Sequence, residues 1–346
     1  MKIVYINWLA PDIFGWKWVA KMQRLLARNG HVLEMVDLQP HGNVAYRRLV
    51  MCYRLLKTVL CARFRHHYKV LYNPYCMTWC IPLFWAMGVR YAIDTTDAQD
   101  LPEMMSLINA PWTKRLWFGA HYYAWALFLQ FAHGAHANNH KALKMAASFG
   151  MPAYRMLLMY DMTLDEIEMS HRAFDGNPPV IGYIGSEGTE FCLGDYTSQI
   201  KTLIDKGYRV EAMGCSEAFC NSIGAVRIPW THKNACTVPR TWLCGLSLLP
   251  MNSRLDGKVA GKLFQYFAAG IPVVSSVQGE VAHMGLDASI IFIRKPEDLL
   301  TAIYTLNSNR AMSYEMGARG RREIMRMCGD DMQLPLFEKW LRVMTR

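Results

Sequence analysis

With 346 residues the chain is long enough for two domains of ordinary size, and its 52% hydrophobic against 19% charged residues exclude an intrinsically disordered protein. The formal net charge of +10 favours an anionic partner, such as a phosphate-bearing substrate, an acidic lipid surface or nucleic acid. The ten cysteines are scattered without a C-x-x-C pair, which favours free thiols in a reducing compartment over disulfides.

The first half of the chain alternates between strand and helix patterns. The opening run KIVYI is typical of a buried parallel strand, and Asn7 and Pro11 interrupt the apolar start, so no secretion signal is predicted. The loop after this strand carries Gly15, at the end of a parallel strand where α/β sheets bind ligands. The elements predicted next are a helix over residues 18–30 and strands over residues 31–38, 69–74 and 90–97.

Two groups of candidate metal ligands lie in this half. His133, His136 and His140 are assigned to a helix beside aromatic residues, where they form no metal-ligand pattern. Cys76 and Cys80 are spaced for one helix face, but the sequence offers no second pair of ligands to complete a metal site with them. The sequence therefore predicts neither a metal site nor a cofactor.

A long segment of the first half, residues 38–93, contains no acidic residue. Its basic and aromatic residues, densest over residues 47–69, suit an anionic membrane surface, a solvated basic face or, less well, nucleic acid. The most apolar later stretch, residues 117–137, carries His121 and Gln130 and falls short of the roughly 20 apolar residues that cross a membrane, so no transmembrane helix is predicted.

A second α/β pattern starts after the polar segment DGNPP at residues 175–179. Its predicted elements are a strand with a glycine-bearing loop over residues 180–190, a helix over 196–207 and strands over 209–214, 243–250 and 271–276. Two such units predict an α/β protein with two Rossmann-like, doubly wound domains facing each other across a cleft. We expect domains over residues 1–174 and 175–325, with a helical segment, residues 326–346, packing back toward the first domain.

Gly182, Gly185 and Gly188 invite comparison with a dinucleotide-binding loop. A hydride-transferring enzyme would carry G-x-G-x-x-G here and an acidic residue at the end of the next strand. The first spacing is wrong and Glu211 comes too early, so an oxidoreductase is not expected.

The segment RLDGKVAGKLFQYFAAGIPVVSS, residues 254–276, places two cations and an amide at a helix–turn–strand junction. A helix N-terminus with Lys258 and Lys262 could hold a diphosphate, and Gln265 one turn on could bind a sugar or ribose hydroxyl. The alternative is a pair of solvated lysines on a helix that ends ordinarily at Gly270.

This segment resembles the donor-binding segment of GT-B glycosyltransferases, in particular of glycosyltransferase family 4, many of which carry a pattern like GK-x-x-x-K-L-L-Q-Y-M-A-x-G-x-P-V-V-A-S. The resemblance extends to CGLSLLPM, IPW, IGYIGSEGTEFCL and MGARGRREIMR, and to YAIDTTDA in the first half. It implies a nucleotide-sugar donor held by the second domain, an acceptor held by the first, retention at the anomeric carbon and no obligate metal.

The resemblance also assigns roles. Lys258 and Lys262 would bind the donor diphosphate and act in catalysis. The other donor contacts would come from Gln265 and Tyr266, near the ribose or base, and from Gly185, Ser186 and Thr189, near the sugar-phosphate. Asp97 would be a catalytic carboxylate, with Gly15 and Asp94 on the acceptor side. Alternatively, Asp97 is a helix N-cap.

Two features depart from the family pattern. Lys258 and Gln265 stand where many members have two glutamates, and Thr96 stands where a second acid is common, which leaves the acid/base assignment open. The expected function is sugar transfer to a cell-envelope, polysaccharide or lipid-linked acceptor, in the cytoplasm or at the inner face of its membrane. A glycosyltransferase acting on nucleic acid and a catalytically silent nucleotide-sugar binder are the alternatives.

Overall fold

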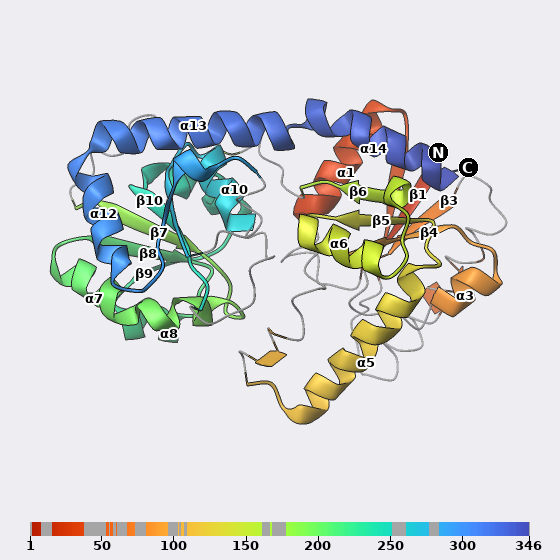
Figure 1. The fold of residues 1–346 in the computed structure, drawn as a ribbon, viewed down its shortest axis with the longest axis horizontal. Helices are drawn as coiled ribbons and strands as arrows, with labels where there is room; N and C mark the ends of the chain where they lie inside the picture. Colours follow the sequence, from red (N-terminus) through yellow and green to blue (C-terminus); the bar gives the residue numbers. More distant parts are fainter. Residues whose placement is uncertain are drawn as a thin grey trace. The chain divides into compact units, whose positions relative to one another are not determined.

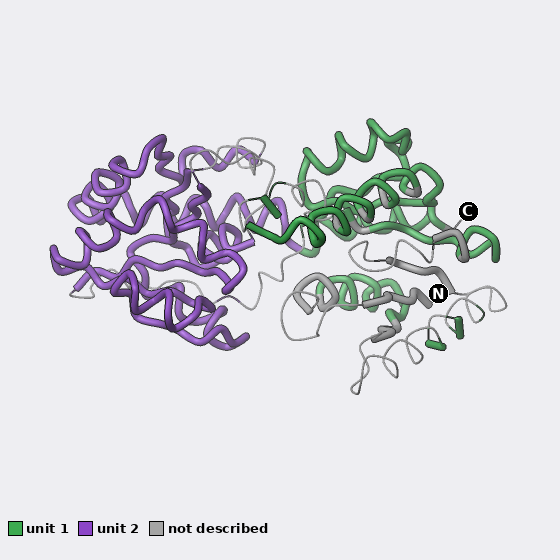
Figure 2. Tube along the Cα trace, turned by 90° about the horizontal axis from the view of Figure 1, so that it is seen from below, with its two compact units in different colours: residues 1–163, 330–346 green, residues 164–329 purple. Residues whose placement is uncertain are grey.

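The protein is represented by a computed structural model that describes residues 2–7, 16–37, 53–54, 56–57, 60, 68–72, 81–95, 103, 105–106, 109–160, 167, 178–250, 261–276 and 284–345. The chain divides into two compact units (Figure 2). Unit 1 comprises Met1–Thr163 and Asp330–Arg346, and unit 2 comprises Leu164–Gly329. The sequence placed these divisions after residues 174 and 325.

Unit 1 is built on a parallel six-stranded sheet in the order β2-β1-β3-β4-β5-β6. The strands are β1 (Lys2–Asn7), β2 (Val32–Asp37), β3 (Tyr68–Tyr72), β4 (Tyr91–Asp94), β5 (Gly134–Ala137) and β6 (Met156–Leu158). The helices are α1 (Trp16–Arg28), α3 (Ile81–Ala86), α5 (Trp112–Leu129), α6 (His140–Ser148) and α14 (Asp330–Thr345) (Figure 1). The strand order reverses between β1 and β3, which is the doubly wound arrangement.

The end of the chain completes the core of unit 1. Helices α1 and α14 pack together with strand residues in one cluster of buried side chains. The cluster comprises Met22, Leu25, Leu26, Leu33, Ala92, Leu157, Met159, Phe337, Trp340, Leu341 and Met344. A segment more than 300 positions away in the sequence thus supplies one wall of this core.

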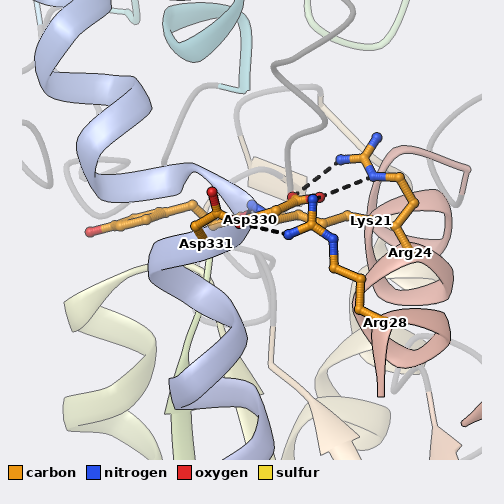
Figure 3. A network of polar contacts seen from close by, with 6 residues as sticks. Lys21, Arg24, Arg28, Asp330 and Asp331 are labelled. Carbon is orange, nitrogen blue, oxygen red and sulfur yellow. Dashed lines mark hydrogen bonds and ion pairs between the residues drawn. The ribbon is translucent and has the colours of Figure 1, made fainter. Parts of the chain in front are cut away.

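Ion pairs fix the first turn of α14 to α1 (Figure 3). Arg24 donates from Nε to Asp330 Oδ2 at 3.1 Å and from Nη2 to Oδ1 at 3.2 Å, a two-pronged contact with a carboxylate that is only 7% exposed. Arg28 Nη1 donates to Asp331 Oδ1 at 2.7 Å, but the Asp331 carboxylate is 94% exposed. Both aspartates also lie at the helix N-terminus, where negative charge is favourable.

We expect Asp330→Asn to loosen α14 far more than Asp331→Asn does. Removing one partner of a buried ion pair leaves the other charge without compensation, and we expect the opening free energy of α14 to fall by roughly 2 kcal/mol because Arg24 retains partial access to water. Amide hydrogen exchange in α14 should then be about 30-fold faster. Asp331→Asn is the matched control, and equal exchange in the two variants would show that burial of the pair does not matter.

Unit 2 contains the second parallel sheet, in the order β12-β11-β10-β7-β8-β9. Its strands are β7 (Val180–Ile184), β8 (Arg209–Met213), β9 (Val226–Ile228), β10 (Cys244–Ser247), β11 (Val273–Ser275) and β12 (Ile290–Phe292). Its helices are α7 (Thr197–Asp205), α8 (Glu217–Ile223), α9 (His232–Thr237), α10 (Gly261–Ala268), α12 (Asp298–Ser308) and α13 (Arg310–Cys328) (Figure 1). The mixed α/β fold with two parallel sheets, predicted from the sequence, is confirmed.

Two glycines paired across neighbouring strands make room for large rings in unit 2. Gly182 on β7 pairs with Gly245 on β10. A Cβ on Gly182 would come within 1.8 Å of the Trp242 ring, and one on Gly245 within 2.3 Å of the Tyr266 ring. Both rings are fully buried and meet edge to face at 6.1 Å, so the paired glycines position them on the sheet.

This packing explains why glycines stand at positions 182 and 185, which the sequence analysis compared with a dinucleotide-binding loop. Gly182 serves a tryptophan ring rather than a phosphate, and a Cβ on Gly185 would come within 2.5 Å of the Tyr183 ring. Trp242 is held further by its Nε1, which donates to the buried Glu211 at 2.7 Å. Gly182 and Glu211 are therefore parts of the core of unit 2.

The candidate metal ligands of the first half lie differently from the prediction or outside the described residues. His133 and His136 were assigned to a helix, but His133 directly precedes β5 and His136 lies on it, buried, with Nε2 3.0 Å from Met159 O. Cys76 and Cys80 fall outside the described residues. Within the described part of the chain, no helix is long and apolar enough to cross a membrane.

Candidate functional site

The strand order of unit 2 reverses between β7 and β10. From β7 the chain proceeds to β8 and β9 on one side, and from β10 to β11 and β12 on the other. The carboxyl ends of β7 and β10 therefore diverge into loops that leave in opposite directions, and open α/β sheets bind their ligands at such a point. The predicted donor-site residues of unit 2 that the structure describes follow β7 or lie on α10.

The loop after β7 is a closed turn made by its own side chains. Ser186 N donates to Thr189 Oγ1 at 2.9 Å, and Thr189 N donates back to Ser186 O at 2.8 Å. The two hydroxyl oxygens lie 3.3 Å apart. Gly185 N donates to Met213 O at 2.9 Å, which ties the start of the turn to the end of β8. Gly185, Ser186 and Thr189 thus lie together in one turn.

The loop after β8 braces this turn. Gly214 has a φ of +82°, and a Cβ there would lie 2.3 Å from Gly185 O, so only glycine fits. Two residues further, Ser216 donates from its N and its Oγ to the Glu190 carboxylate at 2.9 and 3.0 Å. Ser216 Oγ also accepts from Phe219 N and caps α8. These loops form one preorganised edge.

Sequence reasoning missed Gly214, Glu190 and Ser216. A glycine directly after a strand and a serine before a helix are local signals that could have marked the β8 loop. Its pairing with Glu190 depends on which strands are neighbours, and that is a property of the fold.

Lys262 lies at the same edge of the sheet. It is the second residue of α10, half-buried, and its Nζ is 4.0 Å from the centroid of the Tyr183 ring on β7. A cation this close to a ring face is attracted to it. Tyr183 Oη donates to Thr189 O at 3.0 Å, so the same ring contacts both the ammonium and the turn after β7. Burial raises the pKa of Tyr183 well above its ordinary value and keeps the phenol neutral.

Burial also keeps a second group that interacts with Lys262, the Cys215 thiol, in its neutral form. The pKa of Cys215 is raised to about 12, chiefly because the side chain is buried, although the charge of Lys262 lowers it. Cys215 therefore remains a neutral thiol at physiological pH. It is not an activated nucleophile.

The Tyr266 side chain is hydrogen-bonded to the backbone of the sheet. The resemblance placed it near a ribose or base, but it is fully buried: its hydroxyl accepts from Ile184 N at 2.8 Å and donates to Leu246 O at 3.1 Å. These backbone groups belong to β7 and β10, so the phenol oxygen is inserted between the two strands where they separate. Tyr266 thus holds the start of the β7 loop through Ile184. Gln265, its neighbour on α10, is also buried at 2% exposure.

The corresponding edge of unit 1 is described in part. Asp94 ends β4, and its side chain is outside the described part, while Thr95 after it is buried. Asn138 and Asn139 follow β5 and are also buried; Asn139 Oδ1 caps α6 by accepting from Ala142 N at 2.6 Å. Sequence reasoning missed these asparagines, although an Asn before a helix is a capping signal.

Several predicted site residues lie outside the described residues. They are Gly15, Asp97 and Lys258. Among the residues that the structure does describe, no three His, Cys, Asp or Glu side chains gather closely enough to hold a metal ion.

Solved structures resemble the chain over nearly its whole length. HepE from Anabaena, determined with UDP and glucose, has a TM-score of 0.66 at 11% identity over 99% of both chains. Sucrose-phosphate synthase from Thermosynechococcus elongatus has a TM-score of 0.70 at 12% identity, over 99% of this chain and 98% of that one. The lipopolysaccharide outer core galactosyltransferase WaaB, in its apo form, has a TM-score of 0.59 at 13% identity over 99% of both.

No family model and no curated protein matches the chain. At identities this low, the likeness establishes the fold and leaves activity to be tested. The parallel sheets with reversed strand order in each unit agree with it. The chain therefore has the GT-B fold, which it shares with these glycosyltransferases.

Proposed function

We propose that the protein is a glycosyltransferase that moves a sugar from a nucleotide-sugar donor to a cell-envelope, polysaccharide or lipid-linked acceptor. The observation that carries the proposal is the position of Lys262: a cation held beside the braced β7 turn, at the strand-order reversal of unit 2. Structures of the same fold include HepE with UDP-glucose. A diphosphate binds where a cation and hydrogen-bond donors lie together, and at this edge Lys262 is the cation and the hydroxyls of Ser186 and Thr189 lie in the neighbouring turn.

The donor would lie across the loops of unit 2. Lys262, together with Lys258, would bind the diphosphate, while Ser186 and Thr189 in the turn after β7 would contact the sugar-phosphate. Gln265 would hydrogen-bond the ribose or base. Tyr266 would act indirectly, by fixing Ile184 and hence the turn.

The reaction breaks the bond between the anomeric carbon and the phosphate oxygen, and the nucleoside diphosphate leaves with the bonding electrons. A new bond joins that carbon to an acceptor hydroxyl, whose proton must be removed. Lys262 would stabilise the charge that develops on the leaving phosphate. Asp97 would orient the acceptor hydroxyl, with Asp94 and Gly15 on the same side. We propose retention at the anomeric carbon and no obligate metal.

With a lipid-linked acceptor, the protein would act at the inner face of the cytoplasmic membrane. The basic segment 47–69, proposed to contact anionic lipid, has three described apolar side chains that are exposed: Tyr53 at 63%, Leu56 at 48% and Leu60 at 37%. Lys57 beside them is also exposed. Exposed apolar groups among cations are typical of surfaces that bind acidic lipids.

A thermal-shift screen against nucleotide sugars tests the proposed activity. We expect one donor to raise the melting temperature of unit 2, by about 5 to 10 °C at 100 times its Kd, because a ligand that binds only the folded state stabilises it by about 2.7 kcal/mol at that concentration. Incubation of the protein with that donor and with glycan or lipid-linked acceptors should then release the nucleoside diphosphate.

The outcomes separate the alternatives. Stabilisation by no nucleotide sugar would contradict the proposal. Stabilisation without release of nucleotide on any acceptor would identify a silent nucleotide-sugar binder.

A further inference from the structure

A short helix of unit 2 contacts the loops after β7, β8, β10 and β11, at the edge of the sheet where the donor would bind. It is the 3₁₀ helix η6 (Glu190–Tyr196), which begins directly after the turn of Ser186 and Thr189 and continues into α7. Runs of 3₁₀ helix longer than three or four residues are uncommon, because their hydrogen bonds are poorly aligned. Seven residues in this form need support from outside the helix, and the side chains at its two ends provide it.

Glu190 joins the first end of η6 to the loops after β7 and β8. Its backbone N donates to Ser186 O at 3.0 Å, inside the turn after β7. Its half-buried carboxylate accepts from the N and the Oγ of Ser216, after β8. Glu190 therefore binds both loops at once, one through its main chain and the other through its side chain.

Tyr196 joins the second end of η6 to the loops after β10 and β11. The side chain is fully buried, and burial raises the pKa of its phenol, which stays neutral and keeps a proton to donate. Tyr196 Oη donates to Leu249 O at 3.2 Å, and the phenol is also hydrogen-bonded to the Ser276 side chain. Ser276 Oγ in turn accepts from Leu249 N at 2.8 Å. One phenol thus holds the chain just after two neighbouring strands.

The length of η6 matches the separation of these loops. The strand order places β8 on one side of β7, and β10 and then β11 on the other. Neighbouring strands lie about 4.8 Å apart, so β8 and β10 are separated by roughly 10 Å. Seven residues of 3₁₀ helix rise by roughly 12 to 14 Å. The helix is therefore long enough to connect the loops on both sides of the strand-order reversal.

The loops that η6 connects carry the groups proposed to bind the donor. Ser186 and Thr189 lie in the turn that precedes it, and the chain that follows Leu249 leads to Lys258 and then to Lys262 on α10. A small displacement of such groups is tolerated when the substrate binds but lowers the rate, because the transition state requires closer alignment. The contacts at the two ends of η6 should therefore affect turnover more than affinity.

We infer that η6 sets the positions of the donor-binding loops through Glu190 and Tyr196, which are positioning residues that act without touching the donor. The effect on rate rests on the proposed function. The effect on the loops does not, so it can be measured by itself.

Steady-state kinetics of Tyr196→Phe test the inference at the second end of η6. With the donor found in the thermal screen, and well below the melting temperature of the variant, we expect kcat to fall roughly tenfold and the donor KM to change by less than about threefold. The matched control is Tyr208→Phe. It removes a buried phenol of the same core cluster, hydrogen-bonded to Asn307, at the opposite edge of the sheet. It should lose a similar amount of stability and keep the kcat of the parent.

Glu190→Ala and Glu190→Gln test the first end. Alanine removes both acceptors of Ser216, whereas glutamine keeps one oxygen in place, so we expect kcat to fall roughly tenfold with alanine and less with glutamine. Glu217→Gln is the control, because it removes an exposed carboxylate in the first turn of α8 and leaves the contact between Glu190 and Ser216 intact. Its kcat should equal that of the parent.

Amide hydrogen exchange of the full chain, measured without ligand, tests the loops directly. Glu190→Ala should speed exchange at Ser216, which loses its acceptor, and also at Ser186 in the turn after β7, by about fivefold. Tyr196→Phe should do the same at Leu249, whose own acceptor, Ser276, is unchanged.

The outcomes separate this inference from the proposed activity. Parent-like exchange at both Ser186 and Leu249 would overturn the inference, whatever the activity. An unchanged kcat in Tyr196→Phe, or an equal loss of kcat in Tyr208→Phe, would show that η6 only stabilises the fold. If the parent transfers no sugar, the proposed activity fails, and the exchange rates alone decide whether η6 holds the loops.

Discussion

Replacing Lys262 with alanine is expected to lower turnover by roughly 10² to 10³, with a smaller loss of donor affinity. The ammonium lies at the edge where the leaving diphosphate would gain charge, and one such contact contributes about 3 kcal/mol to the transition state. Steady-state kcat and KM for the donor found in the thermal screen measure the effect. The melting temperature without ligand should fall by no more than a few degrees, since a cation–π contact such as that of Lys262 with the Tyr183 ring contributes about 1 kcal/mol.

Lys206→Ala is the matched control for this variant. Lys206 also lies over a ring, with its Nζ 5.7 Å from the Tyr304 centroid, but it precedes β8 and so lies at the opposite edge of the sheet. Its loss should leave kcat unchanged. Near-parent turnover in Lys262→Ala would mean that Lys262 is only a solvated helix residue, and an equal loss in both variants would point to stability as the cause.

The largest effect on stability is expected from Gly182→Ala. The added methyl group would overlap the Trp242 ring at 1.8 Å, and the ring is pinned by Glu211 and Tyr266. We expect unit 2 to lose about 4 kcal/mol or more of unfolding free energy, because β7 is paired on both sides and the buried Trp242 ring is held by its hydrogen bond to Glu211. Chemical denaturation followed by a signal from unit 2 measures the loss.

Gly194→Ala serves as the control for this clash, because a Cβ at Gly194 meets nothing within 4 Å. It should be nearly neutral. Adding Trp242→Leu to Gly182→Ala should recover part of the lost stability by removing the overlapping ring. If Gly182→Ala alone were as stable as Gly194→Ala, the packing described for β7 and β10 would be wrong.

Long apolar runs made much of the fold predictable. KIVYI and the segment around β7 read as parallel strands because a strand buried on both faces needs side chains that are apolar throughout. The strand β5 was missed because its sequence GAHA has no such pattern and follows a long aromatic helix. Its small residues become a strand through pairing with β4 and β6, which is a tertiary constraint.

The candidate site also contains features that the sequence could predict and one that it could not. Lys262 could be proposed from the sequence because it stands at the start of a helix, whereas Gly185, Ser186 and Thr189 were proposed from the resemblance to a known family. The insertion of the Tyr266 hydroxyl between β7 and β10 could not, since the two strands are far apart in sequence and become neighbours only in the sheet.

The return of α14 to unit 1 has a consequence for biosynthesis. A ribosome releases residues in order, so all of unit 2, a continuous segment ending at Gly329, emerges before α14 does. The core of unit 1 cannot close until Phe337, Trp340 and Met344 have emerged, although Met22 on α1 was synthesised near the start. Unit 1 therefore cannot finish folding first, as N-terminal domains usually do, and the apolar face of α1 is the surface that must be shielded until α14 emerges.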